Sequence, residues 1–428
     1  ERQLEQFANR GYDVLDKIRA LDPSVSLSMS IGIGRGARTL REAQDMAEHA
    51  LDMAQGRGGD QAAEMTLDGF TFYGGVSHGV EKRSKVRSRL VADQLVKLIK
   101  EADHVVIMGH RMSDLDAIGA AEGVLRICKI CDVPAVIAVR RDATLAASLI
   151  DALCKAGQKD DFIDPKDALP IISKRTLCIV VDTYQAGLVE SKDILEKCGK
   201  VAVIDHHRKG VGYIENPALV CHEPYSSSAS ELVTELLQYV GERDDKPNRI
   251  EAEGLLAGIL LDTQDFTLHT GVRTFEAAAA LRRYGAETER VRRLFDVTMV
   301  EYNAKADLVE KAQMYKNCAI SIGGEVAPEA RVAIAQAAND LLRIQGVDAS
   351  FVAVQVGNGV NVSARSMGAV NVQVIMESLG GGGHQTMAAA QLKHITPQAA
   401  RSRIQDAIDQ YYLSQKKTTP EARPAKGE

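Results

Sequence analysis

The chain has 428 residues, of which 45% are hydrophobic, and a net charge of -6. This length allows two or three globular domains with real cores, and the acidic balance argues against a protein that coats long nucleic acids or an anionic membrane. Aromatic residues make up 4% of the chain and Trp is absent, which also excludes a broad base-stacking platform for single strands.

The seven cysteines are scattered and no secretory signal is evident, so we expect a reducing cytosol. Cys128 and Cys131 form a CxxC, but no second pair accompanies them and the apolar spacing around them predicts a helix. A zinc or redox site is the weaker alternative. No apolar stretch approaches the roughly 20 residues that a membrane span needs, and we expect no membrane contact by this chain.

Residues 1–63 predict a helix (1–21), a strand (24–34) and a second helix with apolar residues at helical spacing. The strand ends in "IGIGRG", whose GxGxG spacing differs from the GxGxxG of dinucleotide sites, so we expect a structural glycine turn. Residues 64–100 are expected to be a linker and a basic helix. The basic residues predict a solvated or domain-facing surface, with anion binding as the alternative; they are Lys82, Arg83, Lys85, Arg87 and Arg89.

Apolar strands then alternate with helices over residues 101–285, which predicts a mostly parallel sheet covered on both faces. A helical linker is expected at 286–316, a smaller α/β domain at 317–414 and a disordered tail at 415–428. The fold class is therefore α/β, with an incomplete α+β segment at the N-terminus.

Acidic and histidine side chains recur at the ends of the apolar segments, where open α/β sheets build their sites. One member, Asp262, lies inside a helix-like segment, where an isolated carboxylate is costly to bury without a partner. The candidate residues are His110, Asp114, Asp116, Asp182, Asp205, His206, His207 and Asp262.

Taken singly, these residues have structural explanations: Asp182 as a helix cap and His206 as a hydrogen-bonded core histidine. Taken together, they would repel one another, because two charges 4 Å apart cost about 4 kcal/mol at an effective dielectric constant of 20. Two divalent cations among the carboxylates would replace this repulsion by attraction. Mixed imidazole and carboxylate ligands favour Mn²⁺, with iron, cobalt or zinc as alternatives, over Mg²⁺.

The spacing of these residues resembles the four motifs of the DHH phosphoesterase family, in the same order. By that resemblance His110, Asp114 and Asp182 would hold one metal ion. A second set would hold the other: Asp116, His206, Asp262 and a bridging Asp182. Asp205, His206 and His207 are consecutive, and the two of them without a metal-ligand role, Asp205 and His207, are expected to be catalytic. Asp205 would be an auxiliary ligand or an orienting group, and His207 would act as general acid, with a structural hydrogen bond as the alternative.

"SLGGGGHQTMAAAQL" (378–392) resembles the signature of the DHH-associated substrate-binding domain. By that resemblance Gly381, Gly382, Gly383 and His384 bind nucleotide through exposed backbone N–H groups, and a helix of small residues follows. Arg365 would hold a phosphate; a surface arginine is the alternative. "PYSSSASELV" (224–233) predicts a capped helix start near the site rather than a nucleophile.

Residues 1–63, closing in "GGDQ", resemble the C-terminal half of a GGDEF domain, so the chain is expected to begin inside a domain of a longer protein. A GGDEF domain joined to a DHH pair is typical of the GdpP-type cyclic-di-AMP phosphodiesterases. That resemblance implies hydrolysis of cyclic di-AMP to 5′-pApA, with cyclic di-GMP as a poorer substrate. It also implies a homodimer, and a cytosolic fragment of a membrane-anchored whole. The alternatives are an oligoribonuclease that trims short RNAs and a non-catalytic cyclic-dinucleotide sensor.

Overall fold

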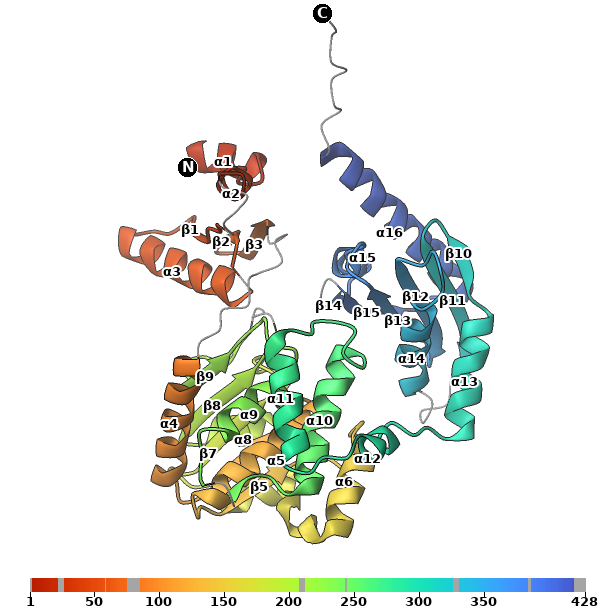
Figure 1. The fold of residues 1–428 in the computed structure, drawn as a ribbon. Helices are drawn as coiled ribbons and strands as arrows, with labels where there is room; N and C mark the ends of the chain where they lie inside the picture. The colour runs from red at the N-terminus through yellow and green to blue at the C-terminus, as the bar shows by residue number, and fades with distance from the viewer. Residues whose placement is uncertain are drawn as a thin grey trace, which may run out of the picture. The chain divides into compact units, whose positions relative to one another are not determined.

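A computed structural model of the chain divides into two compact units, Glu1–Phe295 and Asp296–Glu428 (Figure 1). Within the described parts, no helix combines the length and the apolar character that crossing a membrane requires. The structure describes residues 2–21, 27–57, 59–74, 85–207, 212–242, 245–325, 331–383 and 386–418.

The N-terminal segment holds a three-stranded sheet in the order β1-β2-β3. The single helix expected at 1–21 is two helices, because Gly11 and Tyr12 between them adopt positive φ angles of 61° and 55°. Strand β2 continues past residue 63, so the segment ends later than expected, and no linker begins there. The elements are α1 (Arg2–Asn9), α2 (Val14–Arg19), β1 (Ile31–Gly34), α3 (Leu40–Gly56), β2 (Gln61–Thr66) and β3 (Gly69–Gly74).

The glycines of "IGIG" lie in strand β1 under helix α3, not in a turn. A Cβ atom on Gly32 would lie 2.2 Å from the Ala47 carbonyl oxygen, and one on Gly34 would lie 2.4 Å from that of Ala43. The glycine pattern therefore serves close packing of a helix on a strand, which is a structural role as expected.

The expected parallel sheet is confirmed: six strands pair in the order β6-β5-β4-β7-β8-β9, all in parallel. Alternate residues of the central strands enter two hydrophobic cores, one on each face. The strands are β4 (Val105–Met108), β5 (Ala135–Ala138), β6 (Phe162–Ile163), β7 (Leu177–Val181), β8 (Lys200–Asp205) and β9 (Leu219–His222).

The direction of the chain across the sheet reverses between β4 and β7. From β4 the chain adds β5 and β6 on one side, and then returns to add β7, β8 and β9 on the other. At such a switch point the following loops diverge at the carboxyl ends of the strands and leave room for a ligand. Residues that directly follow β4, β7 and β8 are therefore brought to one place.

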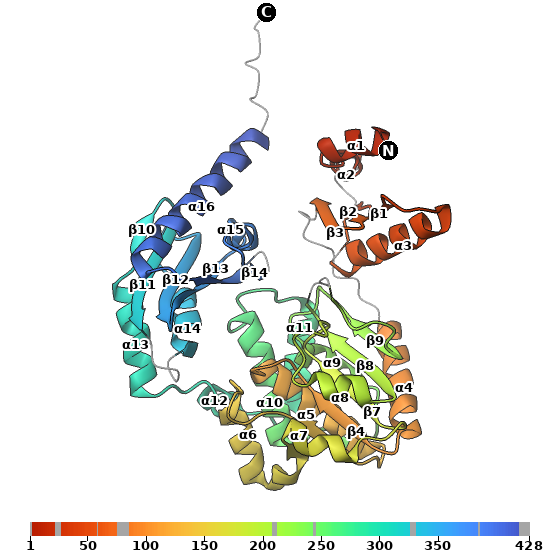
Figure 2. The same ribbon diagram turned by 180° about the vertical axis from the view of Figure 1, so that it is seen from behind.

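Most helices of this domain pack on one face of the sheet, and α7 and α8 pack on the other (Figure 2). Helix α4 starts at Lys85, and residues 81–84 of the predicted basic helix lie outside the described residues. The helices are α4 (Lys85–Glu101), α5 (Leu115–Ile130), α6 (Ala147–Leu153), α7 (Pro165–Ala168), α8 (Lys192–Lys197), α9 (Ala229–Leu237), α10 (Arg249–Thr263), α11 (Val272–Arg283) and α12 (Thr288–Arg293).

The second unit contains a six-stranded mixed sheet in the order β10-β11-β12-β13-β15-β14. Helices α13 and α14 pack on one face and α15 and α16 on the other. The elements are α13 (Met299–Glu310), β10 (Gln313–Tyr315), β11 (Cys318–Glu325), α14 (Arg331–Leu341), β12 (Ala349–Val356), β13 (Gly359–Ser366), α15 (Val372–Ser378), β14 (Gly382–Gly383), β15 (Met387–Lys393) and α16 (Pro397–Thr418).

Three expectations about this unit are corrected. The helical linker expected at 286–316 contains β10, which pairs with β11 and so belongs to the sheet. The helix of small residues expected after the glycine run is wrong, because Met387–Lys393 is a strand paired on both sides. The tail expected from residue 415 is wrong for its first four residues, since α16 continues to Thr418; residues 419–428 lie outside the described part.

Candidate metal centre

His110 and Asp114 follow strand β4. Asp114 is the N-cap of α5, where its Oδ1 accepts hydrogen bonds from the backbone N–H groups of Asp116 (3.0 Å) and Ala117 (3.1 Å). Its other oxygen, Oδ2, lies 3.9 Å from His110 Nε2. His110 Nδ1 lies 2.8 Å from the carbonyl oxygen of Arg111, which can only accept. Nδ1 therefore carries a hydrogen, and Nε2 faces the carboxylates.

Asp116 is completely buried and is held by the start of helix α9. Its Oδ2 accepts the Ala229 N–H (2.7 Å) and its Oδ1 accepts the Ser230 N–H (2.9 Å). The preceding residue, Ser228, is the N-cap of α9, as the sequence "PYSSSASELV" predicts. The N-terminus of a helix attracts negative charge, so α9 fixes this carboxylate in place.

Asp182 directly follows β7 and joins the two halves of the cluster. It is buried with a positive φ of 59°, and its N–H donates to the Ile204 carbonyl oxygen at the end of β8. Its Oδ2 lies 3.4 Å from His110 Nε2, and its Oδ1 lies 3.4 Å from His206 Nε2. One carboxylate therefore contacts two histidines from two different strands.

Strand β8 ends at Asp205, and His206 and His207 follow it directly. The end of this buried strand therefore brings one acid and two histidines to the cluster. Asp205 is completely buried, and its Oδ1 accepts the His207 backbone N–H and lies 2.9 Å from His207 Nδ1. The side chain of His207 is 40% exposed. Asp205 thus orients His207, and His206 Nε2 enters the cluster with Asp182.

Asp262 comes to the cluster from α10, not from a strand end. Its Oδ2 lies 3.0 Å from His206 Nε2, which gives the carboxylate the partner its helix lacks. One turn earlier, a Cβ on Gly258 would lie 2.6 Å from Asp116 Oδ1 and 2.2 Å from Ser230 Oγ. The missing side chain at Gly258 therefore lets α10 approach the start of α5 closely enough to deliver Asp262.

These side chains form overlapping groups whose potential ligand atoms lie within 4.8 Å of one another. One group is His110, Asp114 and Asp182, and another is Asp116, Asp182, His206 and Asp262. Asp182 is common to both, and also to a third group with His206 and His207. Two of the atoms, Asp182 Oδ1 and His206 Nε2, are buried without a hydrogen bond of good geometry in the described structure. Buried oxygen and nitrogen atoms that lack a hydrogen bond are available as metal ligands, and a mixed set of such atoms fits divalent cations.

The electrostatics of the cluster reflect its crowded carboxylates. Burial raises the pKa of Asp116 well above its ordinary value, and the charges of Asp182 and Asp262 raise it further. Burial alone would also raise the pKa of Asp182, but His110 and His206 beside it outweigh burial and lower that pKa. The neighbouring histidines thus favour the ionised form of Asp182, and divalent cations would stabilise the ionised carboxylates of the whole cluster.

In the second unit, Arg365 lies on β13 and is only 9% exposed. Gly381 and Gly383 have a packing reason to be glycine: a Cβ on Gly381 would lie 2.1 Å from the Ala389 carbonyl oxygen, and one on Gly383 2.5 Å from Ala388 Cα. Of the three glycines predicted to bind nucleotide, only Gly382 opens to free space. Strand packing therefore accounts for two of the three predicted glycines, and His384 lies outside the described residues.

The sequence did not single out several residues that build the site. Ala229 and Ser230 supply the backbone donors to Asp116, and His222 Nε2 lies 2.6 Å from the His207 carbonyl oxygen. Both residues belong to "PYSSSASELV", which predicts a helix start near the site, but a backbone donor has no residue signature, so their contact with Asp116 was not predicted. His222 ends an apolar segment in the same way as Asp205, which was an available signal.

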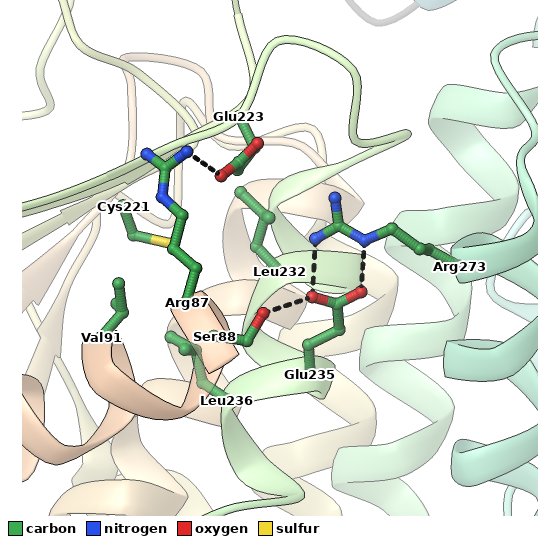
Figure 3. A pocket seen from close by; sticks show the side chains of 9 residues that line it. All are labelled: Arg87, Ser88, Val91, Cys221, Glu223, Leu232, Glu235, Leu236 and Arg273. Carbon is green, nitrogen blue, oxygen red and sulfur yellow. Dashed lines mark hydrogen bonds and ion pairs between the residues drawn. The ribbon is translucent and has the colours of Figure 1, made fainter. Parts of the chain in front are cut away.

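A separate pocket lies between α4, β9, α9 and α11 (Figure 3). Arg273 donates two hydrogen bonds to Glu235, at 2.7 and 2.6 Å, and Ser88 donates a third at 3.2 Å. Arg87 pairs with Glu223 at 2.8 Å. These contacts hold the start of α4 against the domain. They favour a domain-facing surface for the basic helix over the alternative of anion binding.

Comparison with known proteins identifies three segments of the chain. The DHH family N-terminal domain matches residues 104–259, the DHHA1 domain matches 327–413, and the GGDEF domain of GdpP-like cyclic-di-AMP phosphodiesterases matches 1–68. The curated relatives named cyclic-di-AMP phosphodiesterase GdpP from Geobacillus thermodenitrificans and Bacillus subtilis are 44% and 42% identical over 96% of this chain. The chain covers 64% of the length of each.

A solved structure agrees on the fold. An exopolyphosphatase-related protein from Bacteroides fragilis has a TM-score of 0.66 and 20% identity, and the match covers 77% of this chain and 98% of that one. Residues 104–259 and 327–413 thus match the two domains of a DHH-family phosphoesterase, and the parallel sheet with its Asp and His cluster and the second α/β unit agree with these matches. The GGDEF match at residues 1–68 and the two relatives make the chain similar to the GdpP-type members of that family.

Proposed function

We propose that this chain hydrolyses one 3′–5′ phosphodiester bond of cyclic di-AMP and releases linear 5′-pApA, using two divalent cations, with Mn²⁺ preferred. The observation that carries the proposal is the pair of ligand groups that share Asp182. The DHH and DHHA1 matches and the named activity of the two relatives support the substrate. A homodimer, a cytosolic location and a membrane anchor outside this chain belong to the same proposal.

In this proposal His110, Asp114 and Asp182 hold one cation. Asp116, His206 and Asp262 hold the other, together with Asp182. When bound, such cations supply Lewis acidity to a phosphodiester and make a water molecule more acidic. The carboxylates of the cluster would position the cations, and the start of α9 fixes the position of the Asp116 carboxylate.

His207 is proposed to protonate the departing 3′ oxygen. Its Nδ1 is fixed by the buried carboxylate of Asp205, which leaves Nε2 as the ring atom that would give up the proton. In the second unit Arg365 and the backbone of Gly381, Gly382 and Gly383, with His384, would bind the nucleotide. The reaction then gives a free 3′ hydroxyl group and a 5′ phosphate.

The direct test is to incubate the chain with cyclic di-AMP or cyclic di-GMP, with Mn²⁺ or with EDTA, and to separate the products by chromatography. We expect 5′-pApA only with Mn²⁺ and slower cleavage of cyclic di-GMP. Faster cleavage of linear pApA than of the cycle would favour an oligoribonuclease. Tight binding without product at saturating Mn²⁺ would favour a sensor.

We expect His206→Ala and Asp205→Ala each to lower kcat by at least about 100-fold, because one removes a metal ligand and the other releases His207. His104→Ala is the matched control, since His104 precedes β4 at the opposite end of the strand from the cluster. Circular dichroism should show the same fold for all three variants. Substantial activity in His206→Ala would contradict the assignment.

A further inference from the structure

One face of the sheet in the second unit is partly open. Along β15 the side chains alternate between exposed and buried, and the buried ones face the core under α15 and α16. On the other face, α13 and α14 cover apolar residues of β11 and β12. Over β13 and β15 that face carries polar or small residues instead, and Met387 is 42% exposed. The described helices therefore leave the β15 side of this face accessible, whereas α14 approaches β13 and Arg365 there is buried.

Small residues form a floor across this open area. Ala389 of β15 pairs with Ser363 of β13 on one side and with Gly382 of β14 on the other. Directly paired residues point to the same face of an antiparallel sheet, so all three belong to the open face. A Cβ on Gly382 would meet nothing within 4 Å. The floor is two strand spacings wide, about 10 Å, which suits a nucleotide.

A buried cation borders the floor on one side. Arg365 leans back along β13, where its Nη1 donates to Ser363 Oγ (3.1 Å) and to the Ala364 carbonyl oxygen (2.9 Å). Its Nε is buried without a hydrogen bond in the described structure, and the described carboxylates form no ion pair with it. Burial lowers the pKa of Arg365 to about 10, so the guanidinium stays charged at neutral pH. A buried, incompletely paired guanidinium favours an anionic ligand such as a phosphate.

Two amide side chains border the floor on the other side. Asn361 of β13 pairs in register with Gln391 of β15. This pair lies two residues along the strands from the pair Ser363 and Ala389, which is a distance of about 7 Å on the same face of the sheet. Asn361 Oδ1 is buried without a hydrogen bond among the described residues. A carboxamide presents a donor beside an acceptor, and this pair of groups matches two adjacent positions on adenine.

We propose that Asn361, supported by Gln391, binds the base of the nucleotide whose phosphate lies on Arg365, and that it selects adenine over guanine. This inference rests on the proposed function and adds the residues that read the base. On its Watson–Crick edge guanine offers N1–H and the 2-amino group as two adjacent donors, which two acceptors can bind together, whereas adenine offers one donor beside one acceptor. A carboxylate supplies two acceptors and a carboxamide supplies one acceptor and one donor.

The test compares Asn361→Asp and Asn361→Ala with the parent chain. We expect Asn361→Ala to lower kcat/KM for cyclic di-AMP by about 10- to 100-fold, the range of one bidentate base contact. Asn361→Asp should invert the preference, with kcat/KM for cyclic di-GMP equal to or above that for cyclic di-AMP. Gln373→Ala is the matched control, because Gln373 is a half-buried amide on α15, on the opposite face of the sheet, where it donates to Glu377.

Binding of 5′-pApA and 5′-pGpG, measured by calorimetry on the full chain, separates this inference from the proposed hydrolysis. If the parent prefers pApA and both Asn361 variants lose that preference, the base-reading role stands even without turnover. An adenine preference that is unchanged in both variants would overturn it. A parent that binds the two dinucleotides equally would also overturn it. Melting curves should show that both variants stay folded.

Discussion

At the scale of single residues, Asp116 is enclosed by main-chain and glycine contacts. The backbone N–H groups at the start of α9 hold its two oxygens, and α10 passes against it at Gly258. Gly258 and Asp262 are one helical turn apart and so lie on the same side of α10. The contact at Gly258 therefore sets how far Asp262 reaches into the cluster.

We expect Gly258→Ala to destabilise the fold by about 1–3 kcal/mol, since the new methyl group would overlap Asp116 and Ser230. Moving α10 outward to relieve the overlap would carry Asp262 away from His206, so Mn²⁺ affinity should fall as well. Urea unfolding and Mn²⁺ titration measure the two effects.

Gly254→Ala is the matched control for this prediction. It lies one turn earlier on α10, and its Cβ would approach only the side chain of Leu149, at 3.2 Å or more. A side-chain end can move, and alanine favours the helix. Equal losses of Mn²⁺ affinity in the two variants would contradict the role given to Gly258.

At the scale of elements, a buried polar network ties α5 to α10. Arg126 on α5 donates two hydrogen bonds to Glu251 on α10, at 2.8 and 2.6 Å. Gln158 donates to Glu251 Oε1 (3.0 Å) and to Glu122 Oε2 (3.3 Å). Glu122 itself is fully buried, and its Oε1 has no hydrogen bond within the described structure. Glu122 is therefore the weak member of the network.

Burial, and then the charge of Glu251, raises the pKa of Glu122 from 4.5 to about 8. Between these values the unfolded chain releases this proton while the folded chain keeps it, so this group lowers stability as pH rises from about 4.5 to about 8. At about 1.4 kcal/mol per pKa unit the loss is on the order of 5 kcal/mol. Glu122→Gln removes the titration, so we expect it to be more stable than the parent at pH 8 and similar at pH 5.

Urea unfolding at pH 5, 6.5 and 8 measures this difference. Glu101→Gln is the control, because Glu101 is an exposed residue that pairs with Lys200 on the surface. The explanation fails if the stability of Glu122→Gln falls with pH as steeply as that of the parent.

Strand β15 is one of the elements that the sequence predicted wrongly. "MAAAQL" is rich in alanine, which favours a helix, yet these residues pair with β13 and β14. Their alternation of exposed and buried side chains arises because one face packs on α15 and α16. Alanine is too small to show that alternation in the sequence, so pairing and packing decided the structure.

At the scale of the whole molecule, each unit has its own hydrophobic cores. None of the buried clusters in the described residues combines side chains from both units. All the proposed metal ligands belong to the first unit, Glu1–Phe295. Metal binding should therefore stabilise one unit and leave the intrinsic stability of the other unchanged.

We expect calorimetric melting of the full chain to show a transition that Mn²⁺ moves and another that it does not. A ligand at about 100 times its Kd adds about 2.7 kcal/mol, which corresponds to about 5–10 °C for a unit of this size. His206→Ala should abolish the shift. An equal shift of every transition would contradict the separation of the two units.

The sequence alone determined the strand ends, the order of the Asp and His motifs and the α/β class, because these follow from apolar patterning and from local spacing. The tertiary structure decided which oxygen of Asp182 faces which histidine, and why Gly258 must lack a side chain. It also placed Asn361 beside an open floor opposite Arg365. Such relations join residues that are distant in the chain, and they depend on sheet order, register and helix approach, which no local pattern specifies.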